Sequence, residues 1–248
     1  MVSINLGALQ KITVQMVQPN KITPVDDPEK QHCLSAIKAS LQYCFWFGDS
    51  SFRPVDARWV NTKVDEVFKD TKIEDIHDKL DALKEEMINS EITLLKERIE
   101  SIDEMKEIDY PLYGALYQDS KASIDVLLHL PGFKKDHLKK KALFAILDSN
   151  TFSGVSCTFE VPADYRIPQV LVHLGVLEYS TDLQRIIEQD EIIPENSKIE
   201  IQIRESSIDA CNQIAKNCGC TPFDVDSYLF QMKDRCTNKH HLTVTTNY

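Results

Sequence analysis

An acid, a phenol and a guanidinium follow one another in Asp164, Tyr165 and Arg166, directly before an apolar run. Apolar residues then recur at steps of three and four, which predicts a buried helix over residues 168–177. Pro168 suits its first turn, because the ring fixes φ and the missing N–H would have no helical partner there. A residue before proline avoids the α region, so the three polar residues are expected in an extended segment before the helix.

Two interpretations of this acid remain open at the level of residue type. The structural one is an acid at the beginning of a helix that pairs with the neighbouring Arg166. The chemical one is a carboxylate that an adjacent cation keeps ionised, so that Asp164 can stabilise a positive charge in a reaction. Both are kept as hypotheses.

Two further clusters carry groups that could bind a phosphate and a flat base. Residues 134–141 contain five lysines and begin a predicted helix over 138–147, which ends beside Asp148. Residues 41–49, LQYCFWFGD, bring together four aromatic side chains, including Phe45 and Trp46, at the end of a helix expected over 31–47. Taken alone, the lysine cluster is typical of a protein surface and the aromatic cluster is typical of a protein core. Together with Asp164 they supply a carboxylate, a cation and aromatic faces.

The elements that must position these residues are predicted to be mainly α-helical and to form one compact domain over residues 1–248. Seven glycines in 248 residues are few, which favours helices over a turn-rich sheet. One stretch, KIEIQIR at 198–204, alternates strictly and is expected as a short strand, at most, followed by a helix that Ser206 caps and Gly219 ends. The remaining predicted helices lie in 1–18, 59–105, 122–130, after Ser180 or Thr181, and after Thr221.

Composition narrows the function classes. A net charge of −11 argues against binding along a nucleic-acid backbone, which requires a basic face. The first 18 residues lack the pattern of a signal peptide, and no run approaches the ~20 apolar residues of a membrane span. The seven cysteines lack a framework spacing, so free thiols in the cytoplasm, or in the nucleus, are expected.

The common cofactor and hydrolase motifs are missing from the sequence: it contains no glycine-rich nucleotide loop, zinc-protease helix or serine-hydrolase elbow. Histidines come close together only at His240-His241, in a polar C-terminal tail, so no metal and no cofactor is predicted.

Residues 163–180, ADYRIPQVLVHLGVLEYS, closely resemble the hallmark segment of the queuosine salvage proteins, the queuosine 5′-phosphate N-glycosylase/hydrolase family. Further segments are similar to this family in the same order along the chain. They are VSINLGAL, QYCFWF, LLKERI, LHLPGFKKD, the lysine helix 140–148, KIEIQIRESSIDA and DVDSYLF. The chain departs from the family pattern at Leu143, Gln202, Glu205 and Phe230-Gln231.

The resemblance implies a helical fold similar to the helical DNA glycosylases. It also implies hydrolysis of the N-glycosidic bond of queuosine 5′-monophosphate, which releases queuine and ribose 5-phosphate for queuine salvage into tRNA. The functionally central pair of the family corresponds to Asp164 and Lys140. Glycosidic cleavage passes through an oxocarbenium-like state, so Asp164 is expected beside the anomeric carbon and Lys140 at the phosphate.

The other expected roles concern substrate binding. A 7-deazaguanine has carbon in place of N7, so acids such as Asp148 or Asp226 are expected to hydrogen-bond other edges of the base. The aromatic pair Phe45 and Trp46 would stack on it. Tyr165 and Arg166 complete the predicted substrate-binding set.

Two alternatives stay open. The departures at Gln202 and at 230–231 would suit a nucleotide or nucleoside N-glycosidase with a different base preference. A catalytically degenerate helical protein would instead bind a partner through the charged region 60–105. For the glycosidase interpretation, the predicted partner is a small-molecule nucleotide. Direct binding to nucleic acid or to a membrane is not expected, and the oligomeric state is left open.

Overall fold

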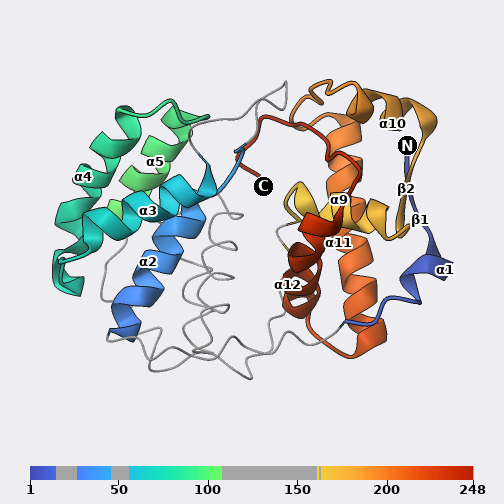
Figure 1. The fold of residues 1–248 in the computed structure, drawn as a ribbon, viewed down its shortest axis with the longest axis horizontal. Coiled ribbons are helices and arrows are strands. Elements are labelled where there is room, and N and C mark those ends of the chain that lie inside the picture. The colour runs from blue at the N-terminus through green and yellow to red at the C-terminus, as the bar shows by residue number, and fades with distance from the viewer. Residues whose placement is uncertain (15–26, 46–55, 108–160, 162, 248) are drawn as a thin grey trace. The chain divides into compact units, whose positions relative to one another are not determined.

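The computed structural model describes residues 1–14, 27–45, 56–107, 161 and 163–247, and these residues are mainly α-helical, as predicted (Figure 1). They fall into two compact units. One contains residues 27–45 and 56–107, and the other contains the rest of the described chain. The expectation of one domain over residues 1–248 stays a prediction.

The first unit consists of helices whose apolar sides meet. Its elements are α2 (Pro28–Ser40), α3 (Ala57–Phe68), the 3₁₀ helix η1 (Ile73–Asp75), α4 (Ile76–Ile88) and α5 (Leu95–Lys106). On α4 the buried residues Leu80, Leu83 and Met87 recur at helical spacing, which confirms the pattern expected for 59–105. Asp56 caps α3 by accepting the backbone N–H groups of Arg58 and Trp59, at 2.9 and 3.0 Å.

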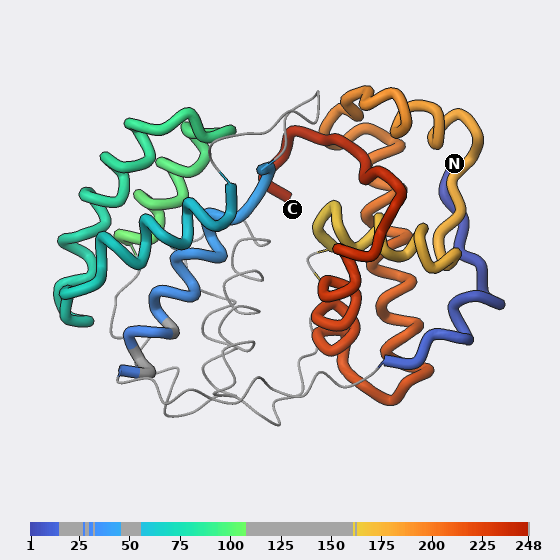
Figure 2. The backbone as a smooth tube through the Cα atoms, in the orientation of Figure 1, coloured from blue at the N-terminus to red at the C-terminus, as the bar shows by residue number. Residues whose placement is uncertain are grey.

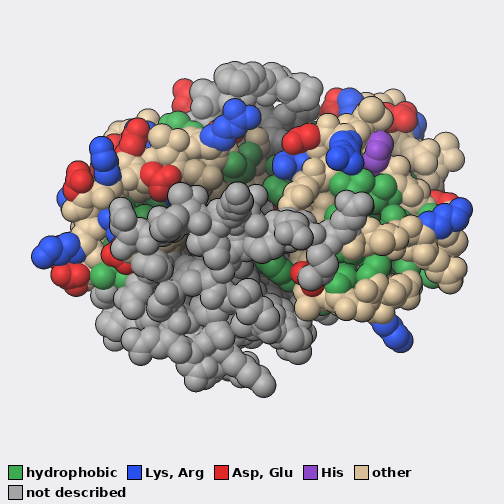
Figure 3. Space-filling model, turned by 60° about the horizontal axis from the view of Figure 1, so that its bottom comes forward, with side chains coloured by type: hydrophobic (Ala, Val, Ile, Leu, Met, Phe, Trp, Pro, Cys, Tyr) green, Lys and Arg blue, Asp and Glu red, His purple; other side chains and the backbone are tan. Residues whose placement is uncertain are grey.

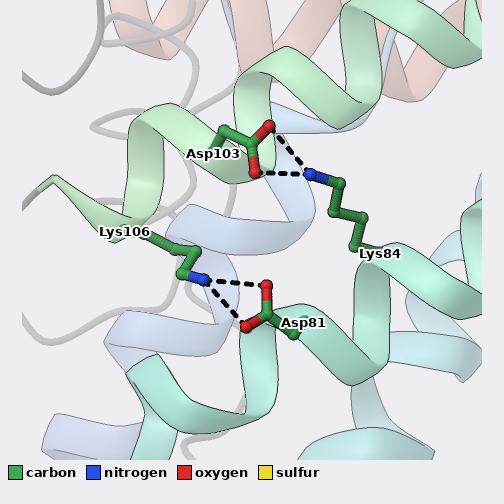
Figure 4. Close-up of polar contacts among 4 residues, drawn as sticks. All are labelled: Asp81, Lys84, Asp103 and Lys106. Carbon is green, nitrogen blue, oxygen red and sulfur yellow. Dashed lines mark hydrogen bonds and ion pairs between the residues drawn. The ribbon is translucent and has the colours of Figure 1, made fainter.

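Two crossed ion pairs join α4 to α5 (Figure 4). Lys84 of α4 contacts Asp103 of α5 at 2.8 Å, and Lys106 of α5 contacts Asp81 of α4 at 2.8 Å. Each helix thus contributes one acid and one base, an arrangement that is satisfied in one register of the two helices. Figure 3 shows side chains of both signs interspersed over this part of the surface, on the left of the view, in agreement with a solvated charged face.

The second unit combines a small sheet with longer helices. Its elements are β1 (Val2–Ile4), α1 (Leu6–Leu9), α9 (Arg166–His173), β2 (Leu177–Tyr179), α10 (Thr181–Glu188), α11 (Lys198–Cys218), α12 (Pro222–Met232) and the 3₁₀ helix η2 (Lys233–Arg235). β1 pairs antiparallel with β2, with Ser3 opposite Glu178. The expectation of one helix over 1–18 is therefore wrong at its beginning, because residues 2–4 pair with a distant strand and Asn5 caps only a short helix.

The strand predicted over 198–204 is also wrong, since these residues begin α11. The Ser197 side chain accepts the N–H of Glu200 at 3.2 Å, and the Glu200 carboxylate accepts the N–H of Asn196 at 3.1 Å, so the cap lies before the supposed strand and not at Ser206. Burial then follows helical spacing through positions 200, 203, 207, 210, 211 and 214. Gly219, with φ of 66°, ends the helix as predicted.

The helix within the hallmark segment is shorter than expected. α9 begins at Arg166, and Pro168 lies in its first turn as predicted. It ends at His173 because Gly175 adopts φ of 70° and Val176 returns its N–H to the carbonyl of Leu171 at 2.8 Å. This turn directs the chain into β2, so residues 174–177 are not helical. α9 packs against α11 and α12.

The cap predicted at Thr221 is confirmed, because Thr221 with Asp224 forms a complete capping box at the beginning of α12. Ser180 occupies the N-cap position of α10, but its side chain makes no cap hydrogen bond to that helix. Within the described part of the chain, six cysteines carry free thiols. A helix of the length and apolarity needed to cross a membrane is not found among the described residues.

Candidate functional site

Asp164 caps α9. Its Oδ1 accepts the backbone N–H of Arg166 at 2.7 Å and that of Ile167 at 3.3 Å, while its own carbonyl accepts the N–H of Ile167 at 3.0 Å. Ala163 before it is buried and adopts φ of 48°, and Tyr165 after it is already in the α region. The extended conformation expected for the three polar residues is therefore wrong for Tyr165 and Arg166, because Tyr165 already lies in the α region and Arg166 begins α9.

Arg166 contacts Asp164 through its backbone, and its guanidinium is engaged with α9 itself. Nη1 donates to Oε1 of Gln169 at 2.9 Å, and Cζ lies 5.2 Å from the ring centroid of Tyr165. Gln169 is in turn buried and joined to the C-terminal segment: its Nε2 donates to the carbonyl of Asn238 at 2.6 Å, and Asn238 Nδ2 donates back to the carbonyl of Gln169 at 3.0 Å. The guanidinium is thus fixed along the helix.

The ring of Tyr165 contacts His240, which the sequence patterns did not bring into the site. The two ring centroids lie 4.6 Å apart with an interplanar angle of 42°. Figure 2 shows how this comes about, because the C-terminal part of the chain, in red, runs beside α9, in yellow. The sequence feature that could have indicated this contact is the pair His240-His241, which was interpreted as part of a polar C-terminal tail.

That tail is largely buried, with His241 2% exposed and Leu242 6% exposed. The carbonyl of Leu242 accepts the N–H of Ile193 at 2.8 Å, next to a parallel bridge between Ile192 and Leu242. Burial, and secondly the charge of His240, lower the pKa of His241 to about 3. Burial is also the main cause that lowers the pKa of His240. Both imidazoles are therefore neutral at pH 7.

Lowering the pH is expected to destabilise the protein through His241. The unfolded chain takes up a proton near pH 6.5, whereas the folded ring resists protonation down to about 3, so stability is full above pH 6.5 and falls below it. The contribution is about 1 kcal/mol per pH unit just below that range. Urea unfolding at pH 7.5, 6.5 and 5.5 should show a smaller loss for His241→Phe than for the wild type. Equal losses, or an NMR titration of His241 near pH 6, would contradict this account.

Asp226, the other described acid of the predicted set, is half-buried on α12. Burial, and then its charge, raise the pKa of the Cys211 thiol on α11 well above the usual value. The carboxylate therefore lies near the interface of α12 with α11, on a helix that also packs against α9. Asp164, Tyr165, Arg166 and Asp226 thus belong to the same compact unit.

Phe45 belongs to the other unit, in a cluster around the buried Arg98. The Arg98 guanidinium lies 4.3 Å from the ring centroid of Tyr43 and 5.1 Å from that of Phe45, and it donates to the carbonyls of Tyr43 and Thr93. The helix expected over 31–47 ends at Ser40, because residues 42–45 follow an irregular path around this guanidinium, with Cys44 at φ of 50°. Arg98 lies within the charged region 60–105 and is fully buried.

The remaining predicted site residues, Lys140, Asp148 and Trp46, lie outside the described residues. Within the residues that are described, no group of three or more histidine, cysteine, aspartate or glutamate side chains could hold a metal ion.

The fold and this site define a mainly helical protein whose candidate centre is a carboxylate at the beginning of a helix. Residues 145–248 match the family model described as queuosine salvage protein. Proteins named queuosine 5′-phosphate N-glycosylase/hydrolase are similar in sequence, and three serve as examples. The one from Schizosaccharomyces pombe is 44% identical over 55 residues, which is 22% of this chain and 16% of that protein. The one from Dictyostelium discoideum is 31% identical over 94 residues, 35% of this chain and 29% of that protein.

The third, from Bos taurus, is 28% identical over 150 residues, which is 50% of this chain and 44% of that protein. The chain thus spans less than half the length of each of these relatives. The resemblance to the queuosine salvage protein family is confirmed: residues 145–248 match the family model, and the similarity to the Bos taurus protein covers half of the chain.

Proposed function

We propose that this chain hydrolyses the N-glycosidic bond of queuosine 5′-monophosphate and releases queuine and ribose 5-phosphate. The observation that carries the proposal is the position of Asp164. It lies within the segment that matches the family model, at the beginning of a buried helix, with its carboxylate oriented by two backbone N–H groups. A helix N-terminus favours a negatively charged group, so this acid is supported as a carboxylate.

The chemistry requires such a group. As the bond to the base breaks, positive charge develops at the anomeric carbon, and a nearby carboxylate stabilises it while orienting water or attacking directly. The two helix bonds fall on Oδ1, which restricts the rotation of the carboxylate and reduces reorganisation during the reaction.

Other residues supply binding in this proposal. Lys140 anchors the 5′-phosphate, Asp148 or Asp226 accepts hydrogen bonds from the leaving base, and Phe45 with Trp46 provides its stacking faces. Tyr165 and Arg166 complete the site beside Asp164, and the family resemblance and the residue chemistry together support these roles.

Incubation of the purified chain with queuosine 5′-monophosphate is expected to release free queuine, detectable by liquid chromatography with mass spectrometry. The same assay with queuosine nucleoside, GMP and AMP identifies the preferred substrate. Release from another nucleotide, but not from queuosine 5′-monophosphate, would support an N-glycosidase of different base preference. No release from any of them would contradict the proposal and favour a helical interaction protein.

A further inference from the structure

The C-terminal segment 238–242 is fastened to its compact unit on both sides of His240. Several contacts hold it, among them these three: Asn238 Nδ2 donates to the Gln169 carbonyl at 3.0 Å, Lys239 Nζ donates to the Glu188 carbonyl at 2.9 Å, and the Leu242 carbonyl accepts the Ile193 N–H at 2.8 Å. Lys239 also forms an ion pair with Asp190. A ring attached to such a segment has a fixed position, because the backbone on either side is held.

His240 is further restricted at its own side chain, since Nδ1 lies 2.8 Å from the carbonyl of His241. Its ring contacts Tyr165, whose ring also lies under the guanidinium of Arg166. The imidazole is neutral near pH 7, because burial lowers its pKa, so it approaches the cation of Arg166 without repulsion. The fixed segment, the histidine ring, the tyrosine ring and the guanidinium therefore form one continuous series of contacts.

This series ends at the proposed catalytic carboxylate. Tyr165 follows Asp164 directly, and the backbone N–H of Arg166 is the closer of the two that Asp164 accepts. We propose that His240 is a positioning residue: through its contact with the Tyr165 ring, it holds Tyr165 and Arg166 in place beside Asp164. The inference rests on the proposed glycosidase function and adds the C-terminal segment to that site.

The consequence is a loss of organisation when the imidazole is removed. Without His240, the Tyr165 ring gains rotamers, and Arg166 keeps its hydrogen bond to Gln169 but loses a fixed ring beneath it. Misplacement of groups around a reacting centre by about 1 Å can lower the rate about a hundredfold. His240→Ala is therefore expected to lower kcat/KM for queuosine 5′-monophosphate by about tenfold to a hundredfold.

The test compares five variants, His240→Ala among them, with the wild type at a temperature where circular dichroism shows all of them folded. His240→Phe keeps an aromatic ring at the contact and should recover most of kcat/KM. His173→Ala removes an exposed histidine from the other end of α9 and should behave as the wild type. Tyr165→Ala and the double variant Tyr165→Ala/His240→Ala should have equal kcat/KM, because His240 acts through Tyr165.

The outcomes separate this inference from the proposed function. Failure of the wild type to release queuine refutes the glycosidase proposal itself. If the wild type is active, full activity of His240→Ala overturns the positioning role, and so does additive loss in the double variant. Independently of activity, Tyr165→Ala should shift the ring-proton NMR resonances of His240, and unchanged resonances would overturn the contact.

Discussion

Asp164→Asn is expected to abolish most base release while leaving the fold as stable as the wild type. Asparagine is as good an N-cap as aspartate, and its Oδ1 can accept the N–H groups of Arg166 and Ile167 in the same way. What it lacks is the negative charge that the oxocarbenium-like state requires. We expect a decrease in kcat of about 10²–10⁴-fold, the range typical of removing a positioned catalytic acid or base. Queuine release measured under saturating queuosine 5′-monophosphate gives this value.

Asp164→Ala removes both the helix cap and the negative charge, so its effect on stability measures the structural contribution of Asp164. The lost cap is expected to reduce the free energy of unfolding by about 1 kcal/mol, in addition to the loss of activity. Asp56 is a matched control, because it caps α3 through the same two kinds of backbone contact in the other compact unit. Asp56→Asn should change neither stability nor activity. If Asp164→Asn retains activity, the carboxylate is only a cap and the catalytic assignment is wrong.

The parts of the fold that could be predicted from the sequence are those fixed by neighbouring residues. Thr221 with Asp224 at the beginning of α12 and Gly219 after α11 act within one helical turn, so their patterns identify these helix ends directly. The long amphipathic pattern of α4 is similarly local.

The prediction of a strand over 198–204 was wrong because seven residues are too few to distinguish a period of 2 from one of 3.6. The features that decide for a helix are the Ser197 cap and the burial of Glu200, and the alternating isoleucines concealed both.

The candidate site was partly predictable because some of its residues are neighbours in the sequence. The segment 164–166 is contiguous, so its polar residues and its helix could be recognised together. The contact of Tyr165 with His240 depends on a pairing across 75 positions of the chain, which no local pattern contains. Residues 42–45 likewise follow the guanidinium of Arg98, which is 55 residues from Tyr43. Non-local polar contacts of this kind decide both the end of α2 and the surroundings of Asp164.

The largest loss of stability is expected from Arg98→Ala. The guanidinium is 0% exposed and donates to two carbonyls, those of Tyr43 and Thr93, while lying over the ring of Tyr43. Its removal leaves both carbonyls without this donor, and a buried unsatisfied group costs about 1–3 kcal/mol. With the lost cation–π contact and the cavity, the free energy of unfolding should fall by about 3–5 kcal/mol in urea titrations followed by circular dichroism.

Arg98→Lys distinguishes the geometry of the guanidinium from its charge. An ammonium group carries the same charge, but it cannot direct two separate N–H donors in the planar arrangement that reaches both carbonyls and the ring. We therefore expect most of the stability loss of Arg98→Ala to persist in Arg98→Lys. Arg58→Ala, at an exposed position of α3, is the control and should remain near the wild type. Wild-type stability of Arg98→Lys would mean that a buried positive charge, and not the planar donor set, organises residues 42–45.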